Sequence, residues 1–227
     1  MREKAPIPAR LDWDYDKYAA AETGCVICGL DEAGRGPLCG SVIAGACVLP
    51  DFATLSAADR DTLAMLDDSK KLSEKKRELL FDVITRTAAA CGIGEATAAE
   101  IDEYNILNAS LLAMRRAVEK AAAALPDSRF FLLVDGNRLG DFPFPAKAVV
   151  HGDATSPSIA AASVIAKVTR DRMCADWDRQ YPGFGIAGHK GYPTKAHREL
   201  VRELLQKGAE LPPIYRRSFL GFAWRKG

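Results

Sequence analysis

The sequence predicts an α/β fold in which a mixed sheet is flanked by helices, with a helical C-terminal part. Three observations predict it. Short apolar runs rich in β-branched residues recur along the chain, segments with helical spacing of apolar residues lie between them, and turn-forming residues separate the two kinds of segment. Strands that alternate with helices form sheets covered by helices.

The composition fits one globular domain. A chain of 227 residues with 48% hydrophobic composition is long enough to bury a full core. Residues 1–22 are polar and interrupted by prolines, so we predict a flexible N-terminal arm there and one folded domain over residues 23–227. The 31 basic and 30 acidic residues almost cancel, so any surface for a polyanion must be a local patch.

The cysteines and the N-terminal residues predict a cytoplasmic protein. Most of the six cysteines lie in apolar stretches, which suits reduced thiols in a cytosolic core. The first residues lack the apolar segment of a secretory signal, and the longest apolar run is far shorter than the roughly 20 residues that span a bilayer. We therefore expect neither secretion nor membrane insertion.

The first half of the folded part is predicted to contain three strands and two helices. Two strands are expected over 25–31 and 40–49, on either side of a turn-forming segment. The spacing of Leu79, Leu80, Val83 and Ile84 predicts a helix that begins near Ser73. A short strand is expected over 91–97. Thr97 and Glu100 then form the capping box of a helix that runs to about Ala124.

The second half is predicted to contain two strands and two helices. The strands are expected over 130–136 and 147–153. Ser156 and Pro157 supply an N-cap and an N1 proline for a helix that reaches Trp177. The last helix is expected from Thr194 to Lys207, and Gly208 ends it.

Three patterns that resemble ligand sites are rejected. Lys17 stands where a calcium loop needs glycine, so the acidic residues before it are predicted to form a solvated arm. The glycine pattern over 183–188 does not follow a strand, which argues against dinucleotide binding. Cys25 and Cys28 have zinc-like spacing but no second pair. The chain also lacks the signature motifs of serine hydrolases, zinc proteases and P-loop enzymes.

Four acidic residues lie at the predicted strand ends. Asp31 and Glu32 end one strand, Asp135 ends a second, and Asp153 ends a third. Carboxylates that meet at one sheet edge repel each other, and bound divalent cations compensate their charge. Oxygen-only ligands favour Mg²⁺ or Mn²⁺. The sequence therefore predicts a metal site at this edge.

One difficulty concerns Asp31 and Glu32. Neighbouring residues of a regular strand point to opposite faces, so these two share a site only where the backbone leaves strand geometry. The glycines at positions 34 and 36 make such a departure plausible.

The chain resembles the ribonuclease HII family, the bacterial type 2 ribonucleases H. The segment GLDEAGRGPLCGSV (29–42) is similar to the family signature. Further similar segments follow in the family's order: DSKKLSEKKR (68–77), EIDEYNILNASLLAMRRAV (100–118), VDGNR (134–138), SIAAASVIAKVTRDR (158–172), HKGYPTKAH (189–197) and RRSF (216–219). The resemblance spans residues 25–220, whereas the large N-terminal domain of the type 3 enzymes has no counterpart.

The resemblance implies a ribonuclease H-like catalytic domain over 23–227 and an endoribonuclease activity. Such an enzyme hydrolyses the RNA strand of RNA–DNA hybrids and nicks 5′ of single ribonucleotides embedded in duplex DNA, leaving 3′-hydroxyl and 5′-phosphate ends. Its partners are RNA–DNA hybrids and ribonucleotide-containing duplex DNA, and we expect a monomer. The resemblance also makes Asp31, Glu32, Asp135 and Asp153 the catalytic ligands of two divalent ions, Mg²⁺ or Mn²⁺.

Substrate-binding residues follow from the same resemblance. Gly34, Arg35 and Gly36 are similar to the family's loop that approaches the ribose 2′-hydroxyl, and Tyr192 matches the tyrosine that senses the junction between ribonucleotide and deoxyribonucleotide. Basic side chains are expected to contact phosphates, namely Lys70, Lys71, Lys167, Arg170 and Arg172. Asp171 is not expected among the ligands and is predicted to form ion pairs on its helix.

Two other functions remain open. One is a nuclease with a similar acid cluster that acts on DNA alone. The other is a nucleic-acid-binding module whose site no longer cleaves. Cleavage of an all-deoxyribonucleotide duplex would favour the first, and binding without metal-dependent cleavage would favour the second.

Overall fold

The computed structural model describes residues 11–224, and the predicted α/β architecture is confirmed. A five-stranded mixed sheet has the strand order β3-β2-β1-β4-β5. The pairs β1/β2 and β2/β3 are antiparallel, whereas β1/β4 and β4/β5 are parallel. Among the described residues no helix is both long and apolar enough to cross a lipid bilayer.

The strands are β1 Val26–Ala33, β2 Val42–Val48, β3 Ala90–Ala96, β4 Phe130–Asp135 and β5 Ala146–Val149. The helices are α1 Tyr15–Thr23, α2 Ala57–Leu63, α3 Glu74–Thr87, α4 Ala98–Ala123, α5 Pro157–Gln180, α6 Ile186–His189 and α7 Lys195–Gln206. Three 3-10 helices are η1 Phe52–Thr54, η2 Gly152–Ala154 and η3 Arg217–Trp224.

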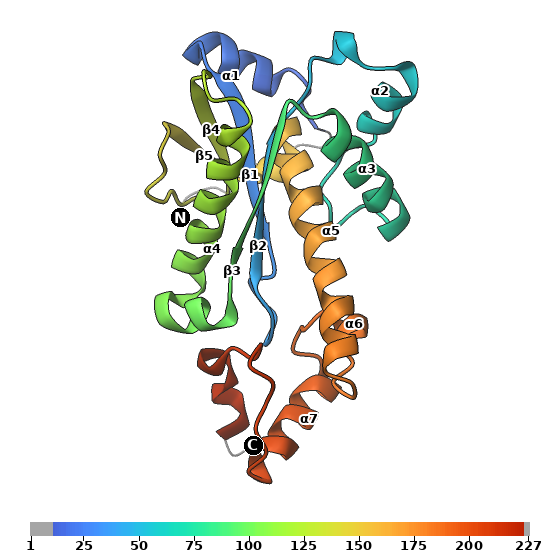
Figure 1. Cartoon of the computed structure of the whole chain (residues 1–227), viewed down its shortest axis with the longest axis vertical. Coiled ribbons are helices and arrows are strands. Elements are labelled where there is room, and N and C mark those ends of the chain that lie inside the picture. The colour runs from blue at the N-terminus through green and yellow to red at the C-terminus, as the bar shows by residue number, and fades with distance from the viewer. Residues whose placement is uncertain (1–10, 225–227) are drawn as a thin grey trace, which may run out of the picture.

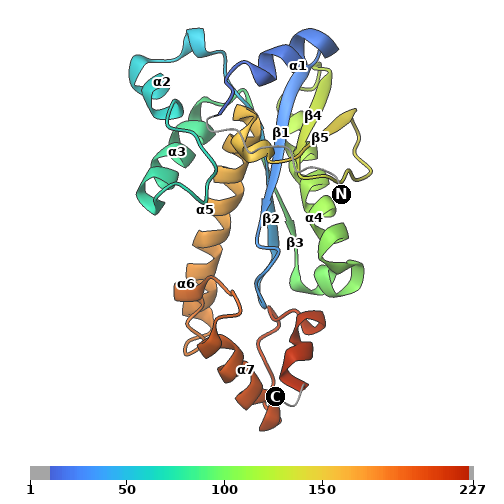
Figure 2. The same ribbon diagram turned by 180° about the vertical axis from the view of Figure 1, so that it is seen from behind.

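Two long helices cover the two faces of the sheet. Helix α4 packs on β1, β2 and β3 from one side and α5 packs on β1 and β2 from the other (Figure 1). Helices α2 and α3 lie on the α5 side, as the view from behind shows (Figure 2). One apolar cluster fills the α4 face, and a second joins α5 to α3. The sheet is therefore the central layer of three.

Glycine lets helix α5 begin directly against the sheet. A Cβ atom at Gly29 in the middle of β1 would lie 2.2 Å from the carbonyl carbon of Ser158. Only a residue without a side chain allows this approach. Ser156 caps the helix by accepting a hydrogen bond from the backbone N–H of Ile159, as the Ser-Pro pattern predicts. This contact fixes the start of α5 and the segment before it relative to β1.

The predicted capping box of α4 is confirmed, and the helix carries a break that its apolar spacing did not indicate. Thr97 and Glu100 make both reciprocal hydrogen bonds. Asn105 has φ 66° and interrupts the helix, while its side chain accepts hydrogen bonds from the backbone N–H groups of Leu107 and Asn108. Its ψ of 164° is extended and not helical, and its side chain serves as the N-cap of the helix that restarts after it.

The C-terminal part is helical, as predicted, and lies beyond the start of β2, next to the β1–β2 connection (Figure 1). It has an apolar cluster of its own, which includes Leu38 and Cys39 from the segment between β1 and β2. The backbone of Gly40 donates to Ile214, and Arg216 donates to Leu38. The C-terminal segment is thus joined to the β1–β2 connection.

The prediction of a loose arm over residues 1–22 is wrong for its second half, the part that the structure describes. Residues 1–10 lie outside the described residues, but 15–23 form helix α1. The Oδ1 atom of Asp16 accepts a hydrogen bond from the hydroxyl of Ser156 at 2.6 Å, and its Oδ2 accepts one from the N–H of Ser158 at 2.8 Å. A carboxylate at the start of α5 stabilises unpaired N–H groups there, a contact between distant segments that local periodicity does not reveal.

Candidate active site

Asp31 and Asp135 lie at equivalent positions on neighbouring parallel strands. The last paired residues of β1 and β4 are Leu30 and Val134, and each acid comes directly after its member of that pair. Residues in register in a parallel pair point to the same face. Gly29, two residues before Asp31, faces α5, so the two carboxylates lie on the α5 side of the sheet.

The expectation that the backbone leaves strand geometry between Asp31 and Glu32 is wrong. Pairing of β1 with β2 continues through Ala33. Strand β4, however, ends at Asp135, so no strand lies beside Glu32 on that side. Glu32 and Asp31 both line a cavity of about 240 Å³. The two adjacent acids share this cavity because the neighbouring strand stops before Glu32.

Asp153 does not end a strand, contrary to the prediction. Strand β5 ends at Val149, His151 adopts the left-handed conformation with φ 55°, and Asp153 lies in η2 directly before α5. The Oδ1 atom of Asp135 accepts a hydrogen bond from the N–H of Gly152 at 2.7 Å. This bond ties the turn that carries Asp153 to Asp135.

The four carboxylates interact electrostatically. Burial raises the pKa of Asp31 well above its usual value, and the negative charges of the three other acids raise it further. Burial is also the first cause of the raised pKa of Glu32, where Asp135 adds to it and Arg35 opposes it. The pKa of Asp153 is raised by burial and then by Asp135. The cluster therefore carries more negative charge than its surroundings compensate.

Lys70 supplies part of the missing positive charge. Its Nζ atom lies 3.6 Å from Oδ2 of Asp153, and the side chain is otherwise 76% exposed. Burial lowers the pKa of Lys70, but the charges of Asp31 and Asp153 more than offset this, so the pKa is raised. Lys70 lines the cavity together with Asp31.

The donor set fits a divalent cation. Four carboxylates offer the hard oxygen ligands that Mg²⁺ and Mn²⁺ prefer. Across the part of the chain that the structure describes, no group of three or more His, Cys, Asp and Glu side chains is arranged to hold a metal ion. Uncompensated carboxylates repel each other, and a cation supplies the charge that draws them together.

The loop of Gly34, Arg35 and Gly36 lines the same cavity as Asp31 and Glu32. Gly34 has φ 101°, and a Cβ atom there would lie 2.1 Å from Nε of Arg170. Glycine is therefore required at position 34 both by its backbone and by its packing. The guanidinium of Arg35 lies 3.4 Å from a carboxylate oxygen of Glu32.

Tyr192 lies over this loop. A Cβ atom at Gly36 would meet Cε1 of Tyr192 at 3.3 Å, so the ring faces the glycine backbone. The ring is 46% exposed and lines the cavity. His197 holds the segment in place, because its Nδ1 is 2.9 Å from the carbonyl oxygen of Tyr192 and its Nε2 is 2.7 Å from the hydroxyl of Tyr215.

Some of the basic side chains that were expected to contact phosphates are already engaged by other groups of the protein. Lys167 lines the cavity, but its Nζ is 2.6 Å from Oδ1 of Asp171, which confirms the ion pair predicted for that acid. The expectation is wrong for Arg170, which is 2% exposed and donates to the backbone carbonyls of Cys39, Ser41 and Lys190. The sequence does not distinguish Arg170 from the charged residues beside it. Which of them is buried depends on the side of the helix that faces the rest of the protein.

Arg216 is the functional candidate that sequence reasoning missed. It was noticed only as part of the RRSF segment, yet its side chain is fully buried and contacts the loop of Gly34. Arginine is seldom fully buried. Nothing in the local sequence indicates this burial, since its partners lie about 180 residues earlier.

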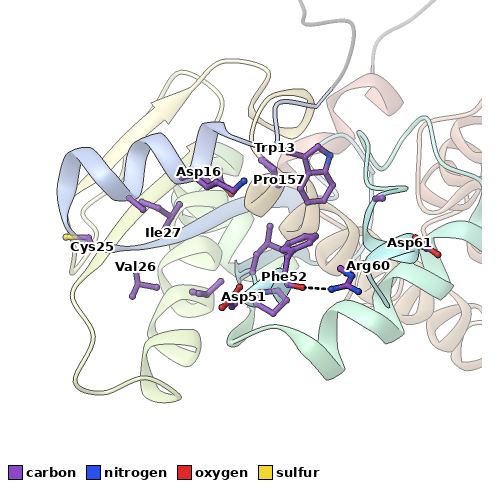
Figure 3. Close-up of a pocket in the computed structure, with 16 residues that line it drawn as sticks. Trp13, Asp16, Cys25, Val26, Ile27, Asp51, Phe52, Arg60, Asp61 and Pro157 are labelled. Atoms are coloured by element: carbon purple, nitrogen blue, oxygen red, sulfur yellow. Dashed lines mark hydrogen bonds between the residues drawn. The ribbon is translucent and has the colours of Figure 1, made fainter. Parts of the chain in front are cut away.

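A second cavity of about 830 Å³ lies at the opposite end of β1 (Figure 3). Val26 and Ile27 at the start of β1 line it together with Trp13 and Phe52, whose rings meet edge to face at 5.1 Å. The lining is mainly apolar and contains none of the predicted site residues. Size alone thus does not identify the site, whereas the converging carboxylates do.

Comparisons with known proteins agree with this geometry. The family model described as Ribonuclease HII matches residues 28–221. A Ribonuclease HII of Magnetococcus marinus is 52% identical over 221 residues, with 96% of each chain covered. The crystal structure of ribonuclease H2 from Pyrococcus horikoshii is 29% identical and superimposes with a TM-score of 0.63 over 85% of this chain and 93% of that one.

A more distant structure shares the fold alone. The crystal structure of Bst-RNase HIII in complex with Mn²⁺ is 17% identical, with a TM-score of 0.67 over 100% of this chain and 77% of that one. The family model and the close relative together settle the assignment. The chain belongs to the ribonuclease HII family of metal-dependent endoribonucleases, which cleave RNA in RNA–DNA hybrids.

Proposed function

We propose that this endoribonuclease nicks duplex DNA on the 5′ side of a single embedded ribonucleotide, and cuts the RNA strand of longer hybrids, with two divalent cations held by the acid cluster. The products carry 3′-hydroxyl and 5′-phosphate ends. The observation that carries the proposal is the position of Asp31 and Asp135 side by side on parallel strands, next to a cavity that is also lined by the loop of Gly34 and by Tyr192.

The acidic side chains provide the ligands of the reaction. Asp31, Glu32, Asp135 and Asp153 would hold Mg²⁺ or Mn²⁺, and such cations activate water and stabilise the leaving oxygen when bound. The ammonium group of Lys70 lies 3.6 Å from the carboxylate of Asp153. Its positive charge can therefore reduce the repulsion between a substrate phosphate and the acids.

Recognition of the ribonucleotide is assigned to the loop of Gly34, Arg35 and Gly36. Glycine permits the backbone to come close to the sugar, and the 2′-hydroxyl is what distinguishes RNA from DNA. Tyr192 faces Gly36 and presents an exposed aromatic ring at the cavity. Its ring is suited to stack against the nucleotide that follows the ribonucleotide.

Binding to the rest of the duplex is assigned to basic side chains. Lys70 and Lys167 are at the cavity, and both already face carboxylates. They supply affinity for phosphate without sequence preference, so binding should weaken as salt increases. We also propose that the protein acts as a monomer, since one chain contains the whole acid cluster and the loop.

The experiment that tests the function compares three duplexes. They contain zero, one or four ribonucleotides in otherwise identical DNA, and they are incubated with the protein in Mg²⁺, in Mn²⁺ or in EDTA. Products are mapped on a denaturing gel. We expect metal-dependent cleavage 5′ of the single ribonucleotide and none of the all-deoxyribonucleotide duplex.

Each competing function predicts a different gel. A nuclease that acts on DNA alone cuts the all-deoxyribonucleotide duplex. A binding module leaves all three duplexes intact in every metal while retaining them in a gel-shift assay. Cleavage only of the duplex with four ribonucleotides would refute the part of the proposal that concerns single ribonucleotides.

A further inference from the structure

Arg216 is buried against the loop that lies next to the acid cluster, and all of its side-chain hydrogen bonds go to backbone carbonyls. Its Nε donates to the carbonyl of Gly40 at 2.8 Å. Its two terminal nitrogens donate to the carbonyls of Gly34 at 2.7 Å, Pro37 at 2.9 Å and Arg35 at 3.1 Å. One guanidinium therefore gathers four carbonyl groups from a segment of seven residues.

This arrangement is energetically unusual. Arg216 has 0% exposure, and no carboxylate within salt-bridge distance is found for it among residues 11–224. Burial lowers the pKa of Arg216 to about 9, and the positive charge of Arg170 lowers it as well. A buried cation without an acidic partner is expensive unless all its donors are satisfied. The four carbonyls occupy four of its five N–H donors, and each of its three nitrogens has at least one partner, so the loop and the guanidinium depend on each other.

The hydrogen bonds fix the orientation of the loop's peptide groups. In a planar trans peptide the C=O and N–H bonds point in opposite directions. The carbonyl of Pro37 points to Arg216, and the N–H of Leu38 in the same peptide accordingly points away, where it donates to Gly191 at 2.8 Å. The Pro37–Leu38 peptide therefore shows that a carbonyl bonded to Arg216 directs the N–H of the same peptide away from Arg216.

The same geometry applies to two peptides at the cavity. The carbonyls of Gly34 and Arg35 point to Arg216, so the N–H groups of Arg35 and Gly36 point away from it. Within the described part of the chain neither of these N–H groups has an acceptor. Both residues line the cavity next to the acids. They are two unpaired donors held in a fixed direction.

We propose that Arg216 is a positioning residue for ribonucleotide recognition: by holding the carbonyls of Gly34 and Arg35, it presents the N–H groups of Arg35 and Gly36 to the 2′-hydroxyl of the substrate. This inference rests on the proposed function, because it assumes that the loop reads the ribose. In this inference, the orientation of the N–H groups of Arg35 and Gly36 depends on a residue some 180 positions later in the chain.

Arg170 supports the same segment from the other side. Its guanidinium donates to the carbonyls of Cys39 and Ser41, at 3.2 and 3.3 Å, and to that of Lys190 at 2.9 Å. It therefore joins the end of the loop to the segment that carries Tyr192. Since Arg170 reaches none of the carbonyls between 34 and 37, the peptide orientation at the cavity depends on Arg216 and not on both arginines.

The test uses Arg216→Lys, which keeps the positive charge but loses the planar set of donors. Arg217→Lys is the matched control, because Arg217 is the exposed neighbour in the same segment. Affinity is measured by fluorescence anisotropy in EDTA for two duplexes that differ by one 2′-hydroxyl. For wild type and Arg217→Lys we expect preference for the ribonucleotide. For Arg216→Lys we expect that preference to fall about tenfold, with unchanged affinity for the all-deoxyribonucleotide duplex.

The outcomes separate the inference from the function on which it rests. Unchanged preference in folded Arg216→Lys overturns the inference and leaves the function intact. A wild-type protein that neither prefers nor cleaves the ribonucleotide duplex overturns the proposed function. An equal loss of affinity for both duplexes would mean that Arg216 supports the fold alone, and this also overturns the inference.

A second measurement applies if Arg216→Lys does not fold. In ¹⁵N-labelled wild-type protein, the amide resonances of Arg35 and Gly36 should shift more with the ribonucleotide duplex than with the all-deoxyribonucleotide duplex. The amide of Leu38, which is bonded to Gly191, is the internal control and should respond equally to both. Equal shifts for Arg35 and Gly36 with the two duplexes overturn the inference.

Discussion

The ammonium group of Lys70 lies 3.6 Å from the carboxylate of Asp153, at the edge of a cluster of four acids. The cluster raises the pKa of Lys70, which means that the cation is favoured there. A divalent cation and Lys70 therefore compensate the same negative charge. We therefore expect metal affinity and phosphate binding both to depend on Lys70.

The first prediction concerns Lys70→Met. Removal of the ammonium group should raise the affinity of the substrate-free protein for Mn²⁺ severalfold, a modest effect because the side chain is mostly exposed. Isothermal titration with Mn²⁺ measures it. Lys71→Met is the control, since Lys71 pairs with Asp67 at 3.3 Å instead. Equal Mn²⁺ affinity in all three proteins would show that Lys70 does not compensate the site.

The second prediction concerns Asp31→Asn and Asp135→Asn. Each removes one anionic ligand, so cleavage should fall by at least about 10²-fold while the fold is kept. Asparagine at position 135 retains an oxygen that can accept from Gly152 N–H. The measurement is cleavage of the single-ribonucleotide duplex together with circular dichroism. Asp82→Asn, at an exposed position of α3, is the control. A rate like that of wild type in either variant would remove that acid from the site.

The third prediction links stability to pH in EDTA. The folded-state pKa of Asp31 lies above its usual 3.8, so the folded protein holds this proton more tightly than the unfolded chain does. The resulting stabilisation is complete below pH 3.8 and is lost as pH rises through the folded-state pKa. As pH rises above 3.8 and through the raised folded-state pKa, the free energy of unfolding of wild type should fall relative to that of Asp31→Asn.

Urea denaturation at a series of pH values measures this difference. Mn²⁺ should reduce the pH dependence of wild type, because it compensates the charge that protonation otherwise removes. The comparison with Asp31→Asn cancels contributions from groups that do not interact with Asp31, such as His197, whose pKa is lowered by burial. Parallel pH curves for the two proteins would contradict the raised pKa.

The fourth prediction is that alanine substitutions at Gly34 and at Gly36, in the same loop, have different effects. Gly34→Ala places a Cβ atom 2.1 Å from Nε of Arg170 at φ 101°, and it should destabilise the protein by about 2–4 kcal/mol. Gly36→Ala meets only the ring of Tyr192 at 3.3 Å, so stability should change by less than about 0.5 kcal/mol. Cleavage by Gly36→Ala should nevertheless fall about tenfold, because the methyl group occupies the path to the sugar.

Thermal melts and single-turnover cleavage distinguish the two variants. Tyr192→Ala is the matched variant for the contact with Gly36, and it removes the ring that the new methyl group would meet. If Gly36→Ala cleaves like wild type, the backbone at position 36 does not approach the ribose closely.

Much of the fold was predictable because its elements have strong local signals. The apolar runs of β1 and β4, the capping box at Thr97 and the Ser-Pro start of α5 all agree with the structure. Each of these signals lies within a few residues in sequence. Helices α1, α2 and α6 were not predicted, since they are short and depend on contacts with distant segments.

The sequence predicted that the acids of the cluster lie near one another, but not how the backbone places them. Asp31 and Asp135 were expected together because strand ends meet at a sheet edge, and the register bears this out. The end of β5 and the turn at His151 were misjudged, so Asp153 comes from a 3-10 helix instead. The roles of Arg170 and Arg216 depend on partners more than 125 residues away, which no local pattern contains.

The last prediction concerns the N-terminal segment around Asp16, which was predicted to be a loose arm. Its carboxylate accepts hydrogen bonds from Ser156 and Ser158 at the start of α5, three and five residues after Asp153. Asp16→Ala should lower the free energy of unfolding by about 1–3 kcal/mol, because it leaves the hydroxyl of Ser156 without its acceptor. Burial raises the pKa of Asp16, so a neutral acceptor is tolerated there, and Asp16→Asn should lose less than half as much. Urea denaturation of both variants at neutral pH measures the effect, with Asp14→Ala as the exposed control on the same segment. If Asp16→Ala unfolds at the same urea concentration as wild type, residues 11–22 are as loosely held as their sequence suggested.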